Sequence, residues 1–575
     1  MTLRQLTIVL AAGASALAAS VCAQEHAPPL AERTGESDLP LEGARAGEHI
    51  EHASLSILVD PAHRQIAGAI LYRIVATAPL DRLALDLDPR FAISDVSVDD
   101  TAIAPGRWRN PDGLLTIDLP RPLAAGDTAI LALRYRGAPH VAANPPWEGG
   151  MTWSETPDGQ PWIASTVQGE GCDLFWPCID SSAHRIDTMD LLVTVPEALT
   201  AAGNGRLIGT TDNDDGTRTF HWRARNPSNY GIALQIAPYE LARRDYASRF
   251  GNIVPIRFWH LPGHDDGVNR LLGEMEDFLA FFESTVGPYP FADEKAGIAE
   301  TPHLGMEHQT INAYGNGFAR DPLGYDWLLH HEFAHEWFGN QLTHASINHM
   351  WLHEGLGTWM QPLYLERTRG RMQYDAEMWR YRTQIASRVP LVSPDAVRPD
   401  YNDSDAGWGT DIYYKGAWVL HTLRHLVGDE VLFPAITRLV YGTDDPRPGA
   451  IRPVTRTTDD FRRILEDKSG RDLRWFFDAY FTRADLPRLA SAREGGDLLL
   501  EWQTPSRYPF EMPVEVEIDG NRVSVPMTGG RAKLALDSGD RHVLLDPDNR
   551  ILRADDAIAA WRAAQEERRE AAAAE

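Results

Sequence analysis

The spacing of hydrophobic residues changes twice along the chain. From about residue 50, apolar and polar side chains alternate in short runs such as "ASLSILVD", "IAGAILYRIVA", "LLTIDL" and "AILALRYRG". Alternation with a period of two is typical of strands that bury one face. We therefore predict an N-terminal all-β domain over residues 48–245.

Past residue 250, apolar positions recur three and four residues apart, as in "VNRLLGEMEDFLAFFESTVG". This spacing is typical of amphipathic helices, and it predicts further helical segments at 324–340, 351–369, 371–388, 412–427 and 456–484. Short alternating runs such as "DLLLEWQ" and "PVEVEID" return near residue 486. The pattern predicts a mostly helical domain over 246–485, a small β-sandwich over 486–555 and a polar helical tail over 556–575.

The first residues have the pattern of an export signal. Arg4 precedes an apolar stretch that ends in small residues, so we predict a signal peptide over 1–23 that is removed after Ala23. An alternative is a lipoprotein anchored through Cys22. Residues 24–47 are polar and contain prolines, which predicts a linker. No later stretch is long and apolar enough to span a bilayer, so we expect an exported, periplasmic or secreted protein without a transmembrane span.

Composition narrows the possible partners. The chain has 575 residues, 43% of them hydrophobic, which favours several globular domains. A formal net charge of -27 argues against a nucleic-acid partner, which requires a basic face. Beyond the signal peptide the only cysteines are Cys172 and Cys178. An exported protein could join them in a disulfide or bury both as thiols, and the sequence leaves the two possibilities open.

The stretch "HHEFAHEWFGN" contains a candidate metal motif. His331 and His335 are four residues apart, so on a helix they project from one face and could bind one Zn²⁺ per chain. Glu332 lies about 100° further round the helix and can flank the ion without binding it. His330 has no histidine four residues later, so we exclude it as a ligand. We interpret Glu336 as a spectator.

A third ligand is expected from "WLHEGLGTW". Catalytic zinc usually has three protein ligands and an open position. Glu354 begins another helical segment after eighteen intervening residues, and it is the candidate. Zinc lowers the pKa of a bound water, and Glu332 could then accept a proton as that water attacks a carbonyl group. The rival pair His349 and His353 lacks a glutamate after its first histidine, so we assign both to supporting or surface roles.

The order "HEFAHEWFGNQLT" and then "WLHEG" resembles the aminopeptidase N family of zinc metallopeptidases in the gluzincin clan. The family has glutamine and asparagine where Glu336 and His353 stand here. The resemblance implies a multidomain α+β fold. It would comprise an N-terminal β-sandwich or saddle-like domain, a thermolysin-like and mostly helical zinc catalytic domain, and a small C-terminal β-sandwich. The chain would be a short form without the long helical C-terminal domain of larger members.

The stretch "LGMEH" resembles the GxMEN exopeptidase motif of that family. The resemblance implies that Glu307 binds the free α-amino group of a peptide, and that Gly305 and Met306 contact the substrate. Met306 would line the pocket for the first side chain. The sequence departs from the motif at Leu304 and His308.

Two further stretches resemble the family in the expected order. "IYYKGAWVL" resembles its Y-x-K-G segment, which implies that Tyr413 stabilises the oxyanion, while Tyr414 stands where glutamate is common. "TVQGEGCDLFWPCID" resembles TQ-x-E followed by PC-x-D, which implies that Gln168 and Glu170 help to bind the amino terminus from the β domain.

These features together predict a zinc aminopeptidase that hydrolyses the first bond of peptides with a free N-terminus and serves peptide catabolism. Two alternatives stay open. If Leu304 and His308 remove the amine-binding site, the chain would be a zinc endopeptidase of the same fold. A catalytically inactive peptide-binding protein is the alternative from a different class.

Overall fold

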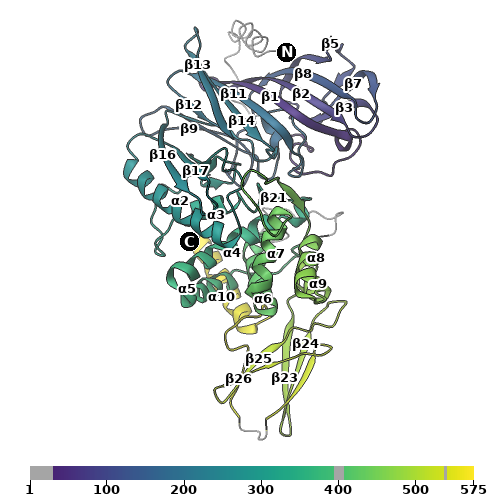
Figure 1. Ribbon diagram of the computed structural model, residues 1–575, viewed down its shortest axis with the longest axis vertical. Helices are drawn as coiled ribbons and strands as arrows, with labels where there is room; N and C mark the ends of the chain where they lie inside the picture. The colour runs from purple at the N-terminus through teal and green to yellow at the C-terminus, as the bar shows by residue number, and fades with distance from the viewer. Residues whose placement is uncertain (1–29, 394–406, 537–540, 575) are drawn as a thin grey trace.

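The structure is a computed structural model that describes residues 30–393, 407–536 and 541–574. The predicted signal peptide therefore lies outside the described residues. Figure 1 shows an elongated molecule with a β-rich domain at one end, helices in the middle and a small β domain at the other end. This arrangement agrees with the multidomain α+β fold expected from the sequence.

The N-terminal domain is built from three sheets. An eight-stranded sheet has the order β13-β14-β11-β1-β2-β8-β4-β5, beside a four-stranded sheet β12-β15-β10-β9 and a three-stranded sheet β3-β7-β6. Buried residues alternate with less buried ones along most of β2, which confirms the period-two pattern. The strands are β1 (Glu48–Asp60), β2 (Gln65–Ala76), β3 (Leu80–Asp86), β4 (Ala92–Val98), β5 (Thr101–Ala102), β6 (Trp108–Arg109), β7 (Leu114–Leu123), β8 (Thr128–Gly137), β9 (Gly150–Glu155), β10 (Pro161–Thr166), β11 (Ile186–Pro196), β12 (Thr200–Ala202), β13 (Arg206–Asp212), β14 (Thr217–Arg225) and β15 (Gln235–Ala237).

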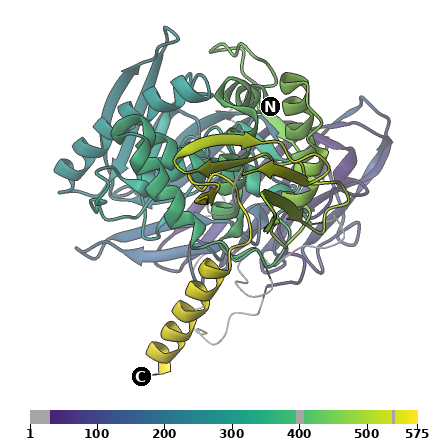
Figure 2. The same ribbon diagram turned by 90° about the horizontal axis from the view of Figure 1, so that it is seen from below.

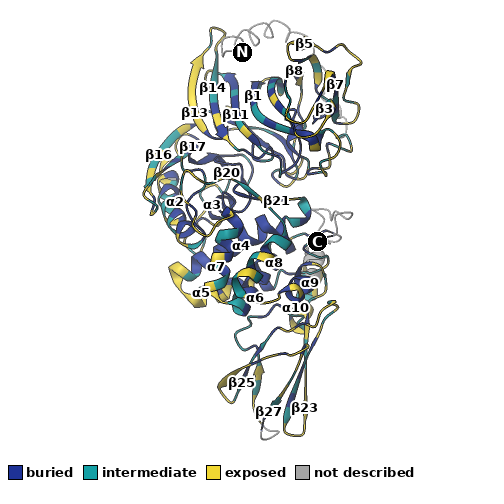
Figure 3. Ribbon diagram, turned by 45° about the vertical axis from the view of Figure 1, so that its right-hand side comes forward, coloured by how far each residue is buried: buried dark blue, intermediate teal, exposed yellow. Residues whose placement is uncertain are grey.

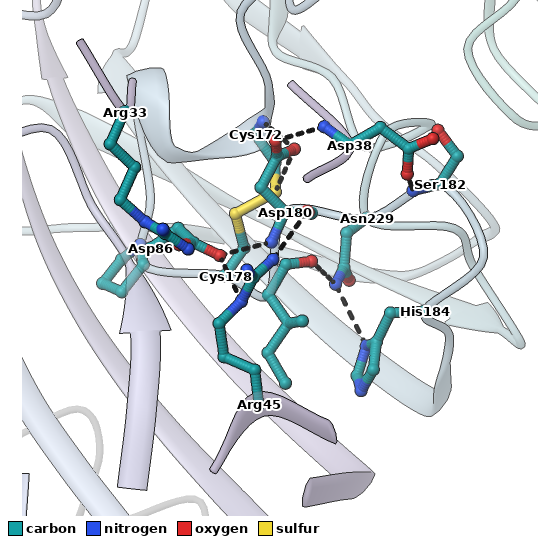
Figure 4. The surroundings of a disulfide bond; sticks show 12 residues. Arg33, Asp38, Arg45, Asp86, Cys172, Cys178, Asp180, Ser182, His184 and Asn229 are labelled. Atoms are coloured by element: carbon teal, nitrogen blue, oxygen red, sulfur yellow. Dashed lines mark hydrogen bonds and ion pairs between the residues drawn. A yellow bond between two sulfur atoms is a disulfide. The ribbon is translucent and has the colours of Figure 1, made fainter. Parts of the chain in front are cut away.

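The segment predicted as a linker packs against this domain instead. Arg33 donates hydrogen bonds of 2.9 and 2.8 Å to Asp86, and Arg45 forms an ion pair of 3.0 Å with the same carboxylate. The backbone N–H of Asp38 donates to Asp180 at 2.9 Å (Figure 4). The linker prediction is wrong for this part of the chain, because polar composition does not reveal charges that find buried partners elsewhere.

The two cysteines form a disulfide. Cys172 and Cys178 are bonded to each other and fully buried, and the short helix η3 (Cys172–Leu174) begins at the first of them (Figure 4). The bond closes the loop between β10 and β11, close to the carboxylate of Asp180. The structure thus decides a pairing that the sequence left open.

The middle domain contains a sheet that the helical spacing did not predict. Its order is β16-β17-β18-β20-β19, and β16 pairs antiparallel with β17. The predicted domain boundary at residue 245 falls inside β16. The strands are β16 (Glu240–Ala247), β17 (Ile253–His260), β18 (Ala296–Glu300), β19 (Gly305–Met306) and β20 (Asn312–Tyr314), with a separate pair β21 (Leu342–His344) and β22 (Val454–Arg456).

The helices of this domain surround the metal motif. They are α2 (Asp265–Thr285), α3 (Trp327–Ala334), α4 (Trp351–Arg369), α5 (Arg371–Arg382), α6 (Asp411–Val427), α7 (Asp429–Tyr441), α8 (Thr458–Ser469) and α9 (Arg474–Phe481). A short turn, η4 (Ile347–His349), precedes α4, and η2 (Arg45–Gly47) precedes β1. The segment predicted at 351–369 is confirmed as α4. The segment predicted at 324–340 is too long, since α3 ends at Ala334. The one predicted at 456–484 is two helices, and α7 was not predicted.

Burial distinguishes neighbouring helices. Figure 3 shows α4 largely buried, whereas α5 presents exposed residues. Every residue of α4 from Trp351 to Leu365 is buried. The helix that carries the third candidate ligand is therefore held on all sides by the core.

The terminal β domain has two three-stranded sheets, β23-β24-β27 and β26-β25-β28. Its strands are β23 (Arg488–Glu494), β24 (Asp497–Gln503), β25 (Val514–Ile518), β26 (Asn521–Val525), β27 (Arg531–Ala535) and β28 (Val543–Leu545). The last helix, α10 (Asp556–Ala574), returns to the middle domain, where Arg562 donates to the carbonyl oxygen of Ile385. Its far end projects from the body (Figure 2). Among the described residues, no helix has the length and apolar character needed to cross a membrane.

Candidate metal centre

A cavity of about 1300 Å³ lies where the N-terminal and middle domains meet. All three candidate metal ligands line it, together with the candidate catalytic and substrate-binding residues Glu332, Tyr413, Glu307, Gly305, Met306 and Gln168. Arg562 of α10 also lines it, so the C-terminal helix contributes to the wall. Residues far apart in the chain thus surround one space that is large enough for a peptide.

Three donor atoms converge in the lining of this cavity. The Nε2 atoms of His331 and His335 are 3.3 Å apart, and they lie 3.4 and 3.5 Å from Oε2 of Glu354. Ligands at about 2.0–2.1 Å from a tetrahedral Zn²⁺ are separated by roughly 3.3–3.4 Å. The triangle therefore fits a zinc ion with two imidazoles and one carboxylate as its ligands.

Neighbouring groups keep these donor atoms able to bind a metal. Nδ1 of His335 lies 2.9 Å from the carbonyl oxygen of Phe338, so the ring donates there and keeps the Nε2 lone pair for a metal. Burial would raise the pKa of Glu354, but the facing imidazoles of His335 and His331 outweigh burial and hold that pKa below its usual range. Glu354 is thus an ionised ligand.

Local helix chemistry explains the position of the two histidines. The side chain of Asp326 caps α3 by accepting the N–H of Leu329 at 3.0 Å. His331 lies in the last turn of α3, and His335 follows directly after its end with helical backbone angles. The spacing of four residues is preserved although the helix is shorter than predicted.

A close crossing of α4 and α6 positions Glu354 and Tyr413 relative to each other. A Cβ atom added to Gly355 would lie 2.9 Å from Cα of Gly416, and one added to Gly416 would lie 2.8 Å from Cα of Gly355. Only glycine allows backbones to approach so closely. The two helices therefore bring a candidate ligand and a candidate catalytic residue to one wall.

Glu332 is buried beside the three donors, with 6% of its surface exposed. Burial and the carboxylate of Glu307 raise its pKa well above the usual range, while His335 opposes this shift. A Cβ atom on Gly305 would lie 2.5 Å from Oε1 of Glu332. Strand β19 therefore passes against this carboxylate, and the glycine leaves room for it.

Glu307 lines the same cavity, close enough to Glu332 for its charge to raise the pKa of that residue. Its Oε1 accepts a hydrogen bond of 2.9 Å from the hydroxyl of Tyr230, a residue of the N-terminal domain that sequence reasoning missed. Burial and the nearby charge of Glu307 raise the pKa of Tyr230, so the phenol remains a donor. The sequence "SNYGIALQ" has the pattern of a chain segment entering a strand, and nothing in it indicates a contact with Glu307.

The remaining predicted residues occupy different positions. Tyr413 lines the cavity, with its ring centroid 6.0 Å from that of His331. Gln168 also lines it. Glu170 is not among the residues lining the cavity, within the described chain; its carboxylate accepts from the N–H of Gly149, and burial raises its pKa to about 7. Glu170 thus supports the loop that carries the lining residue Trp147.

Comparison with known proteins agrees with this site. Residues 324–480 match the Peptidase family M1 domain. The chain is 27% identical over 344 residues to aminopeptidase B of Rattus norvegicus, an alignment that covers 56% of this chain and 48% of the relative. It is 26% identical over 297 residues to aminopeptidase N of Homo sapiens, covering 47% and 30%. The chain therefore spans less than half the length of these curated relatives.

Solved structures give the same result. An M1 zinc metallopeptidase variant from Deinococcus radiodurans, bound to a Tyr-Ser-Ala substrate, matches with a TM-score of 0.65 and 25% identity, covering 79% of this chain and 99% of that one. A two-domain M1 zinc metallopeptidase variant bound to L-tryptophan matches with the same values. The chain belongs to the M1 metallopeptidase family.

The departures from the family motifs lie outside the donor triangle of this M1 metallopeptidase. The side chain of Glu336 is fully buried and accepts from the N–H of Thr310 at 2.8 Å, so it is held away from the cavity. His353 accepts from the N–H of His344 at 3.0 Å and stacks on that ring. His349 bonds Thr458 instead, so the rival histidine pair does not converge.

The two departures near the exopeptidase motif have different positions. Leu304 lines the cavity, whereas His308 is buried and its Nδ1 lies 3.2 Å from the amide nitrogen of Gln235. Burial lowers the pKa of His308 to about 3, which keeps it neutral. His330 lies in an aromatic cluster that includes Phe278 and Phe282, which accounts for its exclusion as a ligand.

Proposed function

We propose that this M1 metallopeptidase is a zinc aminopeptidase that removes one residue at a time from peptides with a free N-terminus. The observation that carries the proposal is the shared cavity. Glu307, oriented by Tyr230, lies in the same space as the donors His331, His335 and Glu354. A carboxylate at a short distance from the reacting centre suits an α-ammonium group. The names of the matched relatives support the same activity.

His331, His335 and Glu354 would hold one zinc ion per chain. Bound there, zinc supplies a Lewis acid and lowers the pKa of a coordinated water. Each remaining task falls to a side chain of the protein.

Glu332 is the proposed general base. It directly follows His331 in α3, and its carboxylate lies close to the donor triangle and is shielded from solvent. It would accept a proton from the attacking water and pass it to the leaving amine. Such proton transfer by a positioned carboxylate contributes about 10²–10⁴-fold to a rate.

Tyr413 and Glu307 act on the two ends of the reacting residue. The phenol of Tyr413 would donate a hydrogen bond to the oxyanion that forms when the carbonyl carbon becomes tetrahedral. Glu307 would pair with the α-ammonium group, and Met306 and Gln168 would contact the substrate beside it. This pairing would place the first peptide bond, and no later one, between Tyr413 and Glu332.

The test compares matched peptides with free and acetylated N-termini, each with and without a chelator. We expect cleavage of the free peptides only, loss of activity with the chelator and recovery with Zn²⁺. Equal cleavage of acetylated peptides would contradict the exopeptidase proposal and support an endopeptidase. Binding of the free peptides without any cleavage would support an inactive peptide-binding protein.

We also propose export of the protein to an oxidising compartment. The disulfide between Cys172 and Cys178 supports this, because such bonds persist outside the reducing cytosol. Sequencing the N-terminus of the mature protein from a bacterial host tests it. A start at Gln24 agrees with signal-peptide cleavage, a lipidated Cys22 with the lipoprotein alternative, and a retained Met1 contradicts export.

A further inference from the structure

A second group of metal-binding side chains lies outside the cavity. A ring nitrogen of His260 and one carboxylate oxygen each from Glu240 and Asp265 all lie within 4.8 Å of one another. None of the three lines the catalytic cavity within the described chain. The catalytic chemistry proposed above does not use them.

The fold brings the three residues together from three elements. Glu240, at the start of β16, and His260, at the end of β17, are directly paired across the two strands. Side chains of directly paired residues lie on the same face of a sheet. Asp265 opens α2 a few residues after His260, because the chain turns back at the end of the strand. The sequence alone does not place Glu240 near the other two.

His260 is held in a geometry suited to metal binding. It is 3% exposed, and its Nδ1 lies 2.9 Å from the carbonyl oxygen of Leu261. Its ring packs edge to face against Phe258. Donation from Nδ1 leaves a lone pair on Nε2, and in the described part of the chain no protein hydrogen bond involves that nitrogen. Ligating histidines are oriented in this way by a carbonyl oxygen behind the ring.

The two carboxylates repel each other as long as no cation lies between them. Both Glu240 and Asp265 are exposed to solvent. Within the described residues, neither carboxylate forms a side-chain hydrogen bond or an ion pair. The N-terminus of α2 favours an acidic residue and so explains Asp265 alone. It explains neither the convergence of Glu240 nor the oriented ring of His260.

We propose that His260, Glu240 and Asp265 form a second site for Zn²⁺, separate from the catalytic one. One imidazole and two carboxylates are a donor set that zinc accepts, with water completing the coordination. Because two of its ligands are exposed, this site should bind zinc more weakly than the buried catalytic set. A bound ion would link β16, β17 and α2, and so stabilise the start of the middle domain.

Metal analysis of an untagged protein tests the proposal. Wild type, D265N, E240Q and the matched control D266N are equilibrated with Zn²⁺ buffered at micromolar free concentration, and bound zinc is counted per chain. Asp266 is also exposed and in the first turn of α2, but lies outside the cluster. We expect two zinc ions in wild type and D266N, and one in D265N and E240Q. Cleavage of free peptides should change less than twofold in all four proteins.

A second measurement keeps the proposal separate from the catalytic site. Raising free Zn²⁺ after the catalytic site is saturated should increase the Tm of wild type and D266N, but not that of D265N or E240Q. One zinc ion in every protein would overturn the proposal. Two ions in every protein would also overturn it, because the second would be adventitious. Peptidase activity decides the proposed function independently of both results.

Discussion

Two groups of residues in the cavity are built in different ways: the three zinc donors, called the metal end, and the proposed amine-binding residue Glu307 with its partner, called the amine end. At the metal end, His331, His335 and Glu354 come from a short stretch of one domain, and their donor atoms form a triangle with sides of 3.3–3.5 Å. At the amine end, Glu307 follows a two-residue strand, and its partner Tyr230 comes from the other domain. The metal end therefore depends on helix geometry, and the amine end on how two domains pack.

The support behind each end differs accordingly. Behind the metal end, α4 is buried and crosses α6 at Gly355 and Gly416. At the amine end, single hydrogen bonds hold the chain, such as the 2.9 Å bond from the amide of Asn340 to the carbonyl oxygen of Glu307. Chemistry should therefore fail most sharply at the metal end, and substrate selection should fail at the amine end.

The largest expected effect is at Glu332. E332Q should retain zinc and lose at least about 10²-fold in kcat, because the amide cannot accept the proton. Steady-state kinetics and metal analysis of the same sample measure both quantities. E336Q is the matched control, since Glu336 is held away from the cavity. An active E332Q enzyme would show that the base is misassigned.

Y413F should lower kcat by roughly 10²-fold, the loss seen when one oxyanion donor is removed. Y414F serves as the control, since Tyr414 lines the cavity but its ring packs at a tilt against that of Tyr381. Zinc content and KM should change little in Y413F. If Y414F carries the larger loss in kcat, the two tyrosines have been assigned in the wrong order.

At the amine end, E307Q should lower kcat/KM for free peptides by about 10–10²-fold, since the substrate ammonium loses its charged partner. Y230F removes only the bond that orients Glu307 and should cost roughly tenfold or less. Both losses should fall mainly on KM. An equal effect of E307Q on peptides with and without a free amine would refute the role of Glu307.

The helix crossing can be tested by stability. G355A should destabilise the protein by about 1–3 kcal/mol, because its new methyl group meets the backbone of α6. G357A is the control on the same helix, where a Cβ atom has ordinary contacts starting at 3.4 Å. Urea unfolding of both variants gives the comparison. Equal stability of the two would show that the close approach does not constrain α4.

The smallest effect concerns pH. Burial raises the pKa of Glu170 to about 7, above its ordinary 4.5, so the folded state binds this proton more tightly than the unfolded chain. The protonated carboxyl of Glu170 therefore stabilises the folded protein fully below pH 4.5, and this contribution is lost as the pH rises through 7. Wild type should lose about 1–2 kcal/mol relative to E170Q across this window, measured by urea unfolding at several pH values. Parallel pH profiles for the two proteins would contradict the shift.

Several features followed directly from the sequence. Period-two alternation predicted β2, and the segment predicted at 351–369 is α4. The spacing of His331 and His335 survives even though α3 ends before the second histidine. These predictions hold because they depend on neighbours along the chain, where the periods of strands and helices are fixed.

Other features could not be predicted from the sequence, because they depend on partners far away in the chain. The segment from Arg33 to Arg45 looked like a linker, yet both arginines form ion pairs with Asp86. The same segment also forms hydrogen bonds with Asp180. The strands β18, β19 and β20 are short and wholly buried, and buried strands lack alternation. Tyr230 carries no local signal for Glu307, which lies 77 residues further along the chain.

By itself the sequence determined which residues could bind a metal and which could act on its water. Two histidines one helical turn apart project from the same face of a helix, so both can reach one ion. Only the tertiary structure decided that Glu354 faces them, that Cys172 and Cys178 pair, and that Tyr230 reaches Glu307. The physical reason is range. Helix and strand periods act over a few residues, whereas the packing of two domains places side chains whose sequence separation carries no geometric information.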